Sequence, residues 1–521
     1  MASDPSSVAP TRAAELRAAG IKVVGALALF GALYAIYAHE VKVEEQVQEL
    51  LAGPRTAQGR VGGARGELNK DSPIGWLAAE KSLSAALELQ PNNPWAIGAW
   101  SDVQVFLTGA GVPGHEQLAD AAIARGDAKD VQQEERFEAK ALRLVQQGKA
   151  SEAETYLLSM LARYGSRPRM LDALGIAQRA SGKLTEAKAS FKKAQDSDWR
   201  APRKVANYAQ ALHEDGLYAE ALASWDRALQ ASSEHLRSQM GKARTLAALS
   251  RSGRPSDLKA ARSLIDGVLT RGPDELPQQM KGEALAVRAE VRLAQADVEG
   301  AAKDAADAVG LAPKLAAALR AKALTDAAQK KPAFEAFKAA IAADVYDSST
   351  YFDGAAALAA AGDDAGAEKT LGSFAATLPK NGRYHLALTQ LLFKKDDLKG
   401  AEAEIAKGLA VDPANAQLYF EQGRVMQKKK DLKGAVAAYE RSAQLRDDSP
   451  EVYRQMGEIY LQQKATEESL RAFTGALLRY KAAKTPDAAM DAFYADVEAQ
   501  VTKAGFKKIA KQWVAEAKAA K

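Results

Sequence analysis

Residue types that could carry catalysis or bind metals are few in this 521-residue chain, and their spacing fits no reactive motif. There is no cysteine, which excludes thiol nucleophiles, cysteine-ligated metal sites and disulfide bonds. The Gly-Lys pairs at residues 148, 182 and 241 lack the rest of a phosphate-binding loop, and no Gly-x-Ser-x-Gly turn occurs. No histidine has a partner at metal-ligand spacing; the five are His39, His115, His213, His235 and His385. The sequence therefore predicts a protein that is not an enzyme and has no cofactor, metal or small-molecule substrate.

Charge and composition indicate the kind of partner and the fold class. The chain has 71 basic and 66 acidic residues, and a net charge of +5 is too slight to favour nucleic acid as a partner. Apolar residues make up 47% and charged residues 26%, which is ordinary for a folded protein. Alanine, leucine, lysine and glutamate are strong helix formers, so this composition predicts an all-α fold.

Similar residues recur at intervals of 34 along much of the chain. The matching sets are Gly148, Gly182 and Gly216; Ala153, Ala187 and Ala221; Leu157, Phe191 and Trp225; Tyr419 and Tyr453; Gly423 and Gly457; and Pro379 and Pro413. A fixed period of roughly 20 to 50 residues indicates a repeat architecture in which each unit is one supersecondary motif.

Residues 168–201 show what one unit should look like. Leu171 and Gly175 share one face of a first helix, and Gly182 suits the left-handed turn that ends it. Ala187 and Phe191 then line the inner face of a second helix, with small residues allowing a close approach of the two helices. Two such short helices cannot bury their apolar faces alone, so the units must stack.

This pattern resembles the tetratricopeptide repeat family. The family's sequence of a bulky residue, Leu-Gly, a small residue, an aromatic, a second alanine and a proline is carried here by Leu171, Leu174, Gly175, Ala187, Phe191 and Ala194, and by Tyr419, Gly423, Ala435, Tyr439 and Pro450. The resemblance implies a right-handed α-solenoid of helix-turn-helix units. Unit starts are expected near residues 134, 168, 202, 236, 282, 316, 348, 382, 416 and 450.

The resemblance also implies a partner-binding groove, because the first helix of each unit lines the concave face in this family. The side chains expected to face inward are Arg169, Arg179, Arg203, Asn207, Arg237, Arg244 and Arg320. Guanidinium groups bind carboxylates in a bidentate manner, so an acidic or extended peptide is one interpretation. The alternative is that these arginines only solvate a helix face. Asp172 and Ile176 stand where the family's carboxylate clamp would need other residues, which argues against a heat-shock co-chaperone.

Residues 21–38 form an apolar run whose only charge is Lys22. As a helix the run would span about 27 Å, close to the hydrocarbon thickness of a membrane. Arg12 and Arg17 precede it and acidic residues follow it, so the positive-inside rule places the short N-terminus in the cytoplasm. A cleaved signal peptide or a buried soluble helix is the alternative.

These features predict five segments. They are a cytoplasmic N-terminus over 1–20, a transmembrane anchor over 21–38, a juxtamembrane helix and glycine-containing linker over 39–71, a solenoid of about 11 to 12 repeats over 72–483, and capping helices over 484–521.

The functional interpretation is a scaffold for other proteins, anchored in the inner membrane with its repeats in the periplasm. It would serve a bacterial envelope, secretion or motility assembly. Two alternatives remain at this point, namely a cytosol-facing membrane adaptor or peptide-binding receptor, and an enzyme whose site is not recognised.

Overall fold

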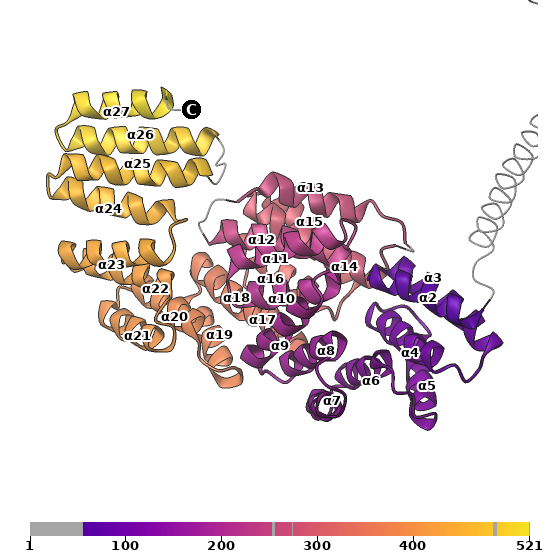
Figure 1. The fold of residues 1–521 in the computed structure, drawn as a ribbon. Helices are drawn as coiled ribbons and strands as arrows, with labels where there is room; N and C mark the ends of the chain where they lie inside the picture. Colours follow the sequence, from indigo (N-terminus) through magenta and orange to yellow (C-terminus); the bar gives the residue numbers. More distant parts are fainter. Residues whose placement is uncertain (1–55, 253–255, 274, 483–486, 520–521) are drawn as a thin grey trace, which may run out of the picture.

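The computed structural model describes residues 56–252, 256–273, 275–482 and 487–519, and this part of the chain consists of 26 α-helices without a strand (Figure 1). The helices are α2 (Ala57–Asn69), α3 (Pro73–Leu89), α4 (Pro94–Gly109), α5 (His115–Ala128), α6 (Glu134–Gln146), α7 (Ala150–Tyr164), α8 (Pro168–Ala180), α9 (Leu184–Ser197), α10 (Pro202–Glu214), α11 (Tyr218–Ala231), α12 (Leu236–Arg251), α13 (Leu258–Leu269), α14 (Gln278–Ala294), α15 (Val298–Leu311), α16 (Ala316–Ala328), α17 (Phe334–Ala343), α18 (Ser348–Ala361), α19 (Asp364–Thr377), α20 (Gly382–Lys394), α21 (Leu398–Val411), α22 (Ala416–Lys428), α23 (Leu432–Leu445), α24 (Pro450–Gln462), α25 (Thr466–Ala482), α26 (Asp487–Lys503) and α27 (Lys507–Ala519).

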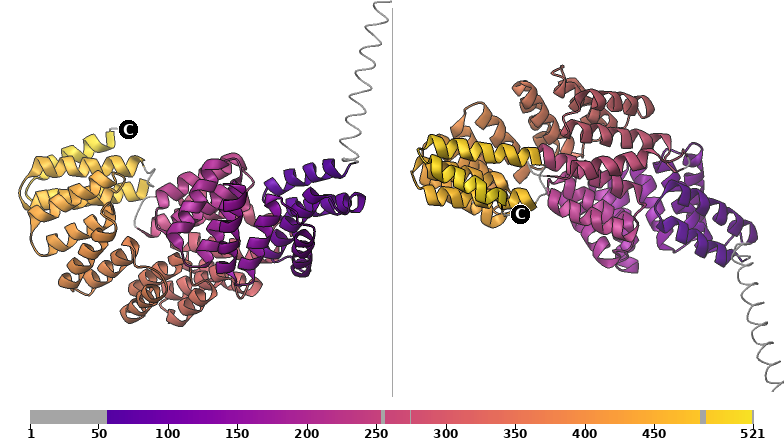
Figure 2. Two further views of the ribbon diagram at one scale, coloured as in Figure 1. Left: turned by 60° about the horizontal axis from the view of Figure 1, so that its bottom comes forward. Right: turned by 90° about the horizontal axis from the view of Figure 1, so that it is seen from above.

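Consecutive helices pack as pairs, and the pairs stack in chain order from α2 to α27 (Figures 1 and 2). First helices begin at residues 134, 168, 202, 236, 316, 348, 382, 416 and 450, which confirms those predicted unit starts. The start expected near 282 lies at Gln278, after a longer connection. The stacked all-α repeat is therefore confirmed for the described residues.

The predicted membrane anchor at 21–38 lies outside the described residues. Among the helices that are described, none combines the length and the apolar character that a membrane crossing requires.

The predicted linker before residue 72 differs from the structure, because residues 57–69 form helix α2. Thr56 caps this helix by accepting a hydrogen bond from the Gly59 amide at 3.1 Å. Ala57, Val61, Ala64 and Leu68 are buried in the same core as α3 and α4. Glycines between these positions hide the helical period in the sequence, and packing against α3 overrides their low helix propensity.

Small residues in first helices face large aromatic residues from the preceding or the same pair. A Cβ atom placed on Gly175 would lie 2.6 Å from the Phe191 ring, and one on Gly241 would lie 2.4 Å from the Trp225 ring. Trp225 is buried and donates a hydrogen bond from its indole nitrogen to the Thr245 hydroxyl at 3.0 Å. Phe191 thus sets the distance between the two helices of its own pair, whereas Trp225 sets the distance to the next pair.

The stack also winds upon itself, so that segments far apart in sequence touch. Three contacts join residues 164 or 165 positions apart: His235 with Asp71, Arg179 with Asp344, and Arg383 with Tyr218. This separation corresponds to about five repeats of 34 residues. Helix α18 accordingly lies beside α10 (Figure 1), and the Ser348 hydroxyl donates to the Glu214 carbonyl oxygen at 2.8 Å. We call these links between successive superhelical turns of the stack the turn-to-turn contacts.

Candidate functional site

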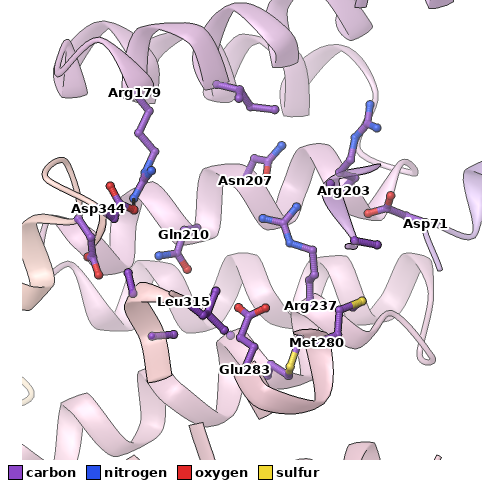
Figure 3. Close-up of a pocket in the computed structure, with 18 of the residues that line it drawn as sticks. Asp71, Arg179, Arg203, Asn207, Gln210, Arg237, Met280, Glu283, Leu315 and Asp344 are labelled. Atoms are coloured by element: carbon purple, nitrogen blue, oxygen red, sulfur yellow. Dashed lines mark hydrogen bonds and ion pairs between the residues drawn. The ribbon is translucent and has the colours of Figure 1, made fainter. Parts of the chain in front are cut away.

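A cavity of about 550 Å³ lies where first helices of successive pairs face one another, and we call it the channel cavity (Figure 3). Its lining comes from the start of α3 and from α4, α6, α8, α10, α12 and α14, with the start of α16, the segment before α18 and one aromatic residue each from α9 and α11. Apolar side chains from five of these helices cover part of the wall: Trp76, Phe106, Ile176, Met240 and Met280. The stacking of the pairs therefore positions the site, since each first helix contributes only a few side chains.

The first ionic cluster beside the cavity joins two arginines to three carboxylates that are fully buried. One terminal nitrogen of Arg169 lies 2.7 Å from Asp102 and 2.7 Å from Glu138. Arg203 pairs with Glu138 and lies 3.3 Å from Asp172. The Arg203 guanidinium also lies over the Phe106 ring of the cavity wall, at 4.5 Å from its centroid.

Burial and the neighbouring charges shift the pKa values of two carboxyl groups of this first cluster in opposite directions. Burial raises the pKa of Asp102 well above its ordinary value, and the Glu138 carboxylate raises it further against the opposing charge of Arg169. Burial also acts on Glu138, but the charges of Arg203 and Arg169 outweigh it and hold the pKa of Glu138 below its ordinary value. A proton on Asp102 would leave two carboxylates facing two guanidinium groups.

The second ionic cluster contains equal numbers of arginines and carboxylates at the contact between turns. Its members are Arg179, Arg244, Arg251, Arg320 and Arg383, with Glu214, Glu290, Asp344, Asp347 and Asp353. Arg179 lies 2.8 Å from Glu214 and 3.0 Å from Asp344. Arg320 is 1% exposed and pairs with Glu290. Such buried pairs need every partner in place, because a single unpaired buried charge is strongly destabilising.

Most of the predicted groove residues are therefore engaged within the protein. Arg169, Arg179, Arg203, Arg244 and Arg320 form ion pairs, and Asn207 donates to Asp172 at 2.9 Å. The cavity lining includes five of the seven predicted residues, and Arg169 and Arg320 are not among them: the five are Arg179, Arg203, Asn207, Arg237 and Arg244. The carboxylates that these five arginines contact therefore belong to the protein itself.

Sequence reasoning missed most of these carboxylates. Glu138 and Asp172 are 34 residues apart and occupy the same position of successive first helices, so the period itself was a usable signal. Glu290 and Asp347 had no such signal, because Glu290 follows the longer connection and Asp347 precedes α18 as its cap.

Arg237 differs from the other predicted arginines. It is exposed and lines the cavity from α12, and it makes no hydrogen bond or ion pair with the residues that the structure describes. Glu283, half-buried on α14, also lines the cavity without such a partner in that part of the chain. Both side chains reach into the space beneath Asn207 and Gln210 (Figure 3).

The histidines within the described part serve as hydrogen-bonding groups. His235 is fully buried and its Nε2 lies 2.9 Å from Asp71 Oδ2, while His385 Nδ1 lies 2.8 Å from Glu404. Burial, with the nearby charges of Arg244 and Arg383, lowers the pKa of His213 well below its ordinary value. Over the residues with assigned positions, no group of three histidine and acidic side chains could hold a metal ion.

Comparison with known proteins gives similarity of structure only. No family model and no curated protein matches the sequence. Solved structures with a similar arrangement include the APC/C hetero-tetramer Cut9-Hcn1 (14% identity, 80% of this chain and 92% of that chain, TM-score 0.35), yeast Tom70 (14%, 74% and 95%, 0.39) and a human IFIT1 dimer with PPP-AAAA (16%, 73% and 90%, 0.40).

The chain's own geometry defines its repeat type. Most helix pairs begin 34 residues after the preceding pair, glycines of first helices contact aromatic rings, and left-handed residues such as Gly148, Gly182 and Gly216 join the two helices of a pair. The described part of this chain is a stack of helix pairs whose period and contacts resemble those of the tetratricopeptide repeat.

Proposed function

We propose that this protein is a scaffold that holds other proteins, and that the channel cavity takes an extended peptide segment of a partner. The observation that carries the proposal is the cavity itself, whose wall is shared by the first helices of six successive pairs. Stacked repeats present continuous concave surfaces suited to extended partners, and about 550 Å³ lies within the range of specific binding pockets.

Site-specific photo-crosslinking tests the proposal in the cell. A benzophenone amino acid replaces Gln210, which lines the cavity, and separately Arg227, which is exposed on the second helix of the same pair. The expected result is a covalent adduct to one defined peptide segment from position 210, identified by mass spectrometry, and none of that segment from position 227. Adducts of equal yield from both positions, or none from position 210, would overturn the channel as the partner surface.

The proposal includes a membrane tether over residues 21–38, with the repeats in the periplasm of a bacterial envelope, secretion or motility assembly. Its support is the apolar run and the basic residues that precede it. Alkaline phosphatase or green fluorescent protein fused after Lys521 reports the side of the membrane, because only the first is active outside the cytoplasm. We expect phosphatase activity in the membrane fraction, and its loss when residues 1–40 are deleted.

The cytosol-facing adaptor is the competing arrangement, and the same fusions separate the two. A fluorescent fusion protein in the membrane fraction, without phosphatase activity, would contradict the periplasmic placement. It would leave the channel as a partner surface untouched, since the crosslinking experiment does not depend on sidedness.

A further inference from the structure

The ionised groups around the channel cavity are almost completely balanced. The second ionic cluster pairs five arginines with five carboxylates, and Asp71 of the lining is held by His235. Arg203 of the lining is neutralised by Glu138 and Asp172. A strongly acidic segment would therefore meet carboxylates as often as guanidinium groups, and this wall does not favour it.

One cation and one anion of the lining make no ion pair of their own, although the charge of Arg237 acts on the Asp71 carboxylate that His235 already binds. Arg237 on α12 and Glu283 on α14 make no ion pair with each other or with another described residue, although both point into the cavity (Figure 3). A charged group that loses water on binding is stabilised most strongly by an opposite charge on the occupant. The complementary occupant thus carries one carboxylate and one ammonium or guanidinium group.

The rest of the cavity wall contains apolar side chains, which favour apolar side chains on the bound segment. Trp76 and Phe106 of the lining pack with ring centroids 5.7 Å apart, and Met240 and Met280 also belong to the lining. Methionine side chains adapt their shape to different apolar partners, which suits a segment rather than one rigid ligand. The Trp76 indole nitrogen is buried without an acceptor in the described residues.

We propose that the segment held in the channel cavity is extended, electrically neutral and apolar, with one acidic residue bound by Arg237 and one basic residue bound by Glu283. This proposal rests on the proposed function, since it names the chemistry of the partner segment in the same cavity. It replaces the acidic peptide expected from the sequence by a segment of mixed charge.

Synthetic hexapeptides with blocked ends provide the probe, measured by calorimetry on the purified full chain. Five peptides of four compositions share a leucine and alanine framework and differ at two positions, which hold glutamate and lysine, two glutamates, two lysines or two glutamines. The mixed pair is tested in both orders. The expected result is that one order of the mixed-charge peptide binds roughly tenfold more tightly than the other three compositions.

Single variants assign each charge. Arg237→Gln should remove the preference for glutamate, and Glu283→Gln should remove the preference for lysine, each with a loss of roughly tenfold in affinity for the mixed peptide. The matched controls Arg227→Gln and Glu299→Gln, at exposed positions outside the cavity lining, should bind like the wild type. The double variant Arg237→Glu, Glu283→Arg should prefer the opposite peptide order.

Several results would overturn the inference. They are tightest binding of the peptide with two glutamates, equal affinity for all four compositions, no binding of the mixed peptide, or single variants that leave the preferences unchanged. A short peptide with free ends that binds more tightly than any blocked peptide would also overturn it, by assigning the cavity to a small zwitterion. Photo-crosslinking of a partner at position 210 could still succeed in each case, so failure here is distinct from failure of the scaffold proposal.

Discussion

Asp102 shows how a single buried carboxyl can set the charge of a whole cluster. Its Oδ2 accepts from Arg169 at 2.7 Å, whereas its Oδ1 is buried without a hydrogen-bond partner in the described residues. Burial, followed by repulsion from Glu138, raises its pKa well above the ordinary value. The folded protein therefore binds a proton at Asp102 that the unfolded chain has already released at the same pH.

Asp102→Asn should consequently change the pH dependence of stability. A raised carboxyl pKa contributes stability that is fully present below the unfolded pKa of about 3.9 and is lost as pH rises through the folded pKa. Relative to wild type, the variant should gain stability as pH rises above about 4, by at most about 1.4 kcal/mol per pH unit. Hydrogen exchange of the α4 amides at several pH values measures this change.

Asp71→Asn should change the pH dependence of stability in the opposite direction, and it serves as a comparison for Asp102→Asn. Burial would raise the pKa of Asp71, but the hydrogen bond from His235 and the charges of His235, Arg203 and Arg237 hold it below the ordinary value. This contribution is present above the unfolded pKa and is lost as pH falls through the folded pKa, so Asp71→Asn should lose stability relative to wild type with rising pH. Equal pH slopes for the two variants would contradict this account.

The candidate site could be predicted from the sequence only in part. The repeat period places Arg203 and Arg237 at equivalent positions, but it does not reveal that Arg203 forms ion pairs with Glu138 and Asp172 while Arg237 lines the cavity without an ion pair to a described residue. That difference arises from which acidic residues of neighbouring first helices fall within reach. The second ionic cluster depends on the winding of the stack, which no local pattern encodes.

At the scale of the helix pair, the spacing between helices depends on glycines that face aromatic rings. Gly241 on α12 leaves no room for a methyl group beside Trp225, whereas Gly267 on α13 has no atom within 4 Å of its ideal Cβ position. The two glycines lie in the two helices of one pair, so they form a matched comparison.

Gly241→Ala should destabilise the protein locally by about 1 to 3 kcal/mol, because the added methyl group must displace the indole ring or the helix. Gly267→Ala should stabilise it by about 0.5 to 1 kcal/mol, because alanine is the better helix former. Hydrogen exchange of α12 and α13 and thermal unfolding measure both effects. A gain of stability in Gly241→Ala would show that Trp225 does not set the spacing.

Helix starts were predictable where the local signals agree with the packing. Ser72 caps α3 and Pro73 begins it, as the Ser-Pro pair indicates. The turns between paired helices were visible as Gly148, Gly182 and Gly216, yet Lys430 and Lys464 adopt the same left-handed backbone. Lysine gives no sequence signal for such a turn, because the conformation there is imposed by the packing of the two helices.

At the scale of the whole molecule, polar contacts hold successive turns of the stack together. Arg383 is central to them, because one of its terminal nitrogens donates to the Glu214 carbonyl oxygen and the other to the Tyr218 hydroxyl at 2.9 Å. Its guanidinium group also lies over the Phe352 ring, 4.6 Å from the centroid. These partners all lie outside its own helix pair, α20 and α21.

Arg383→Ala should therefore separate the turns without unfolding the pairs. We expect a larger radius of gyration in small-angle X-ray scattering, faster hydrogen exchange around Ser348, and an almost unchanged helical circular dichroism spectrum. Lys322→Ala, which removes only an exposed pair with Asp326 on one helix, is the control and should leave the radius unchanged. A loss of helix content in Arg383→Ala would show that the turn-to-turn contacts are required for folding of the helix pairs.

The polar turn-to-turn contacts and the aromatic contacts between helix pairs should also differ in how they respond to a pulling force. Hydrogen bonds and close ion pairs fail once their atoms move apart by about an ångström or two, whereas the interlocked aromatic contacts between helix pairs yield only when whole helices detach. A load applied between the two ends of the stack should first break the turn-to-turn contacts at His235, Ser348 and Arg383. The superhelix would then lengthen while every helix stays folded. The channel cavity lies between the same turns, so tension on a held partner would change the width of the cavity that holds it.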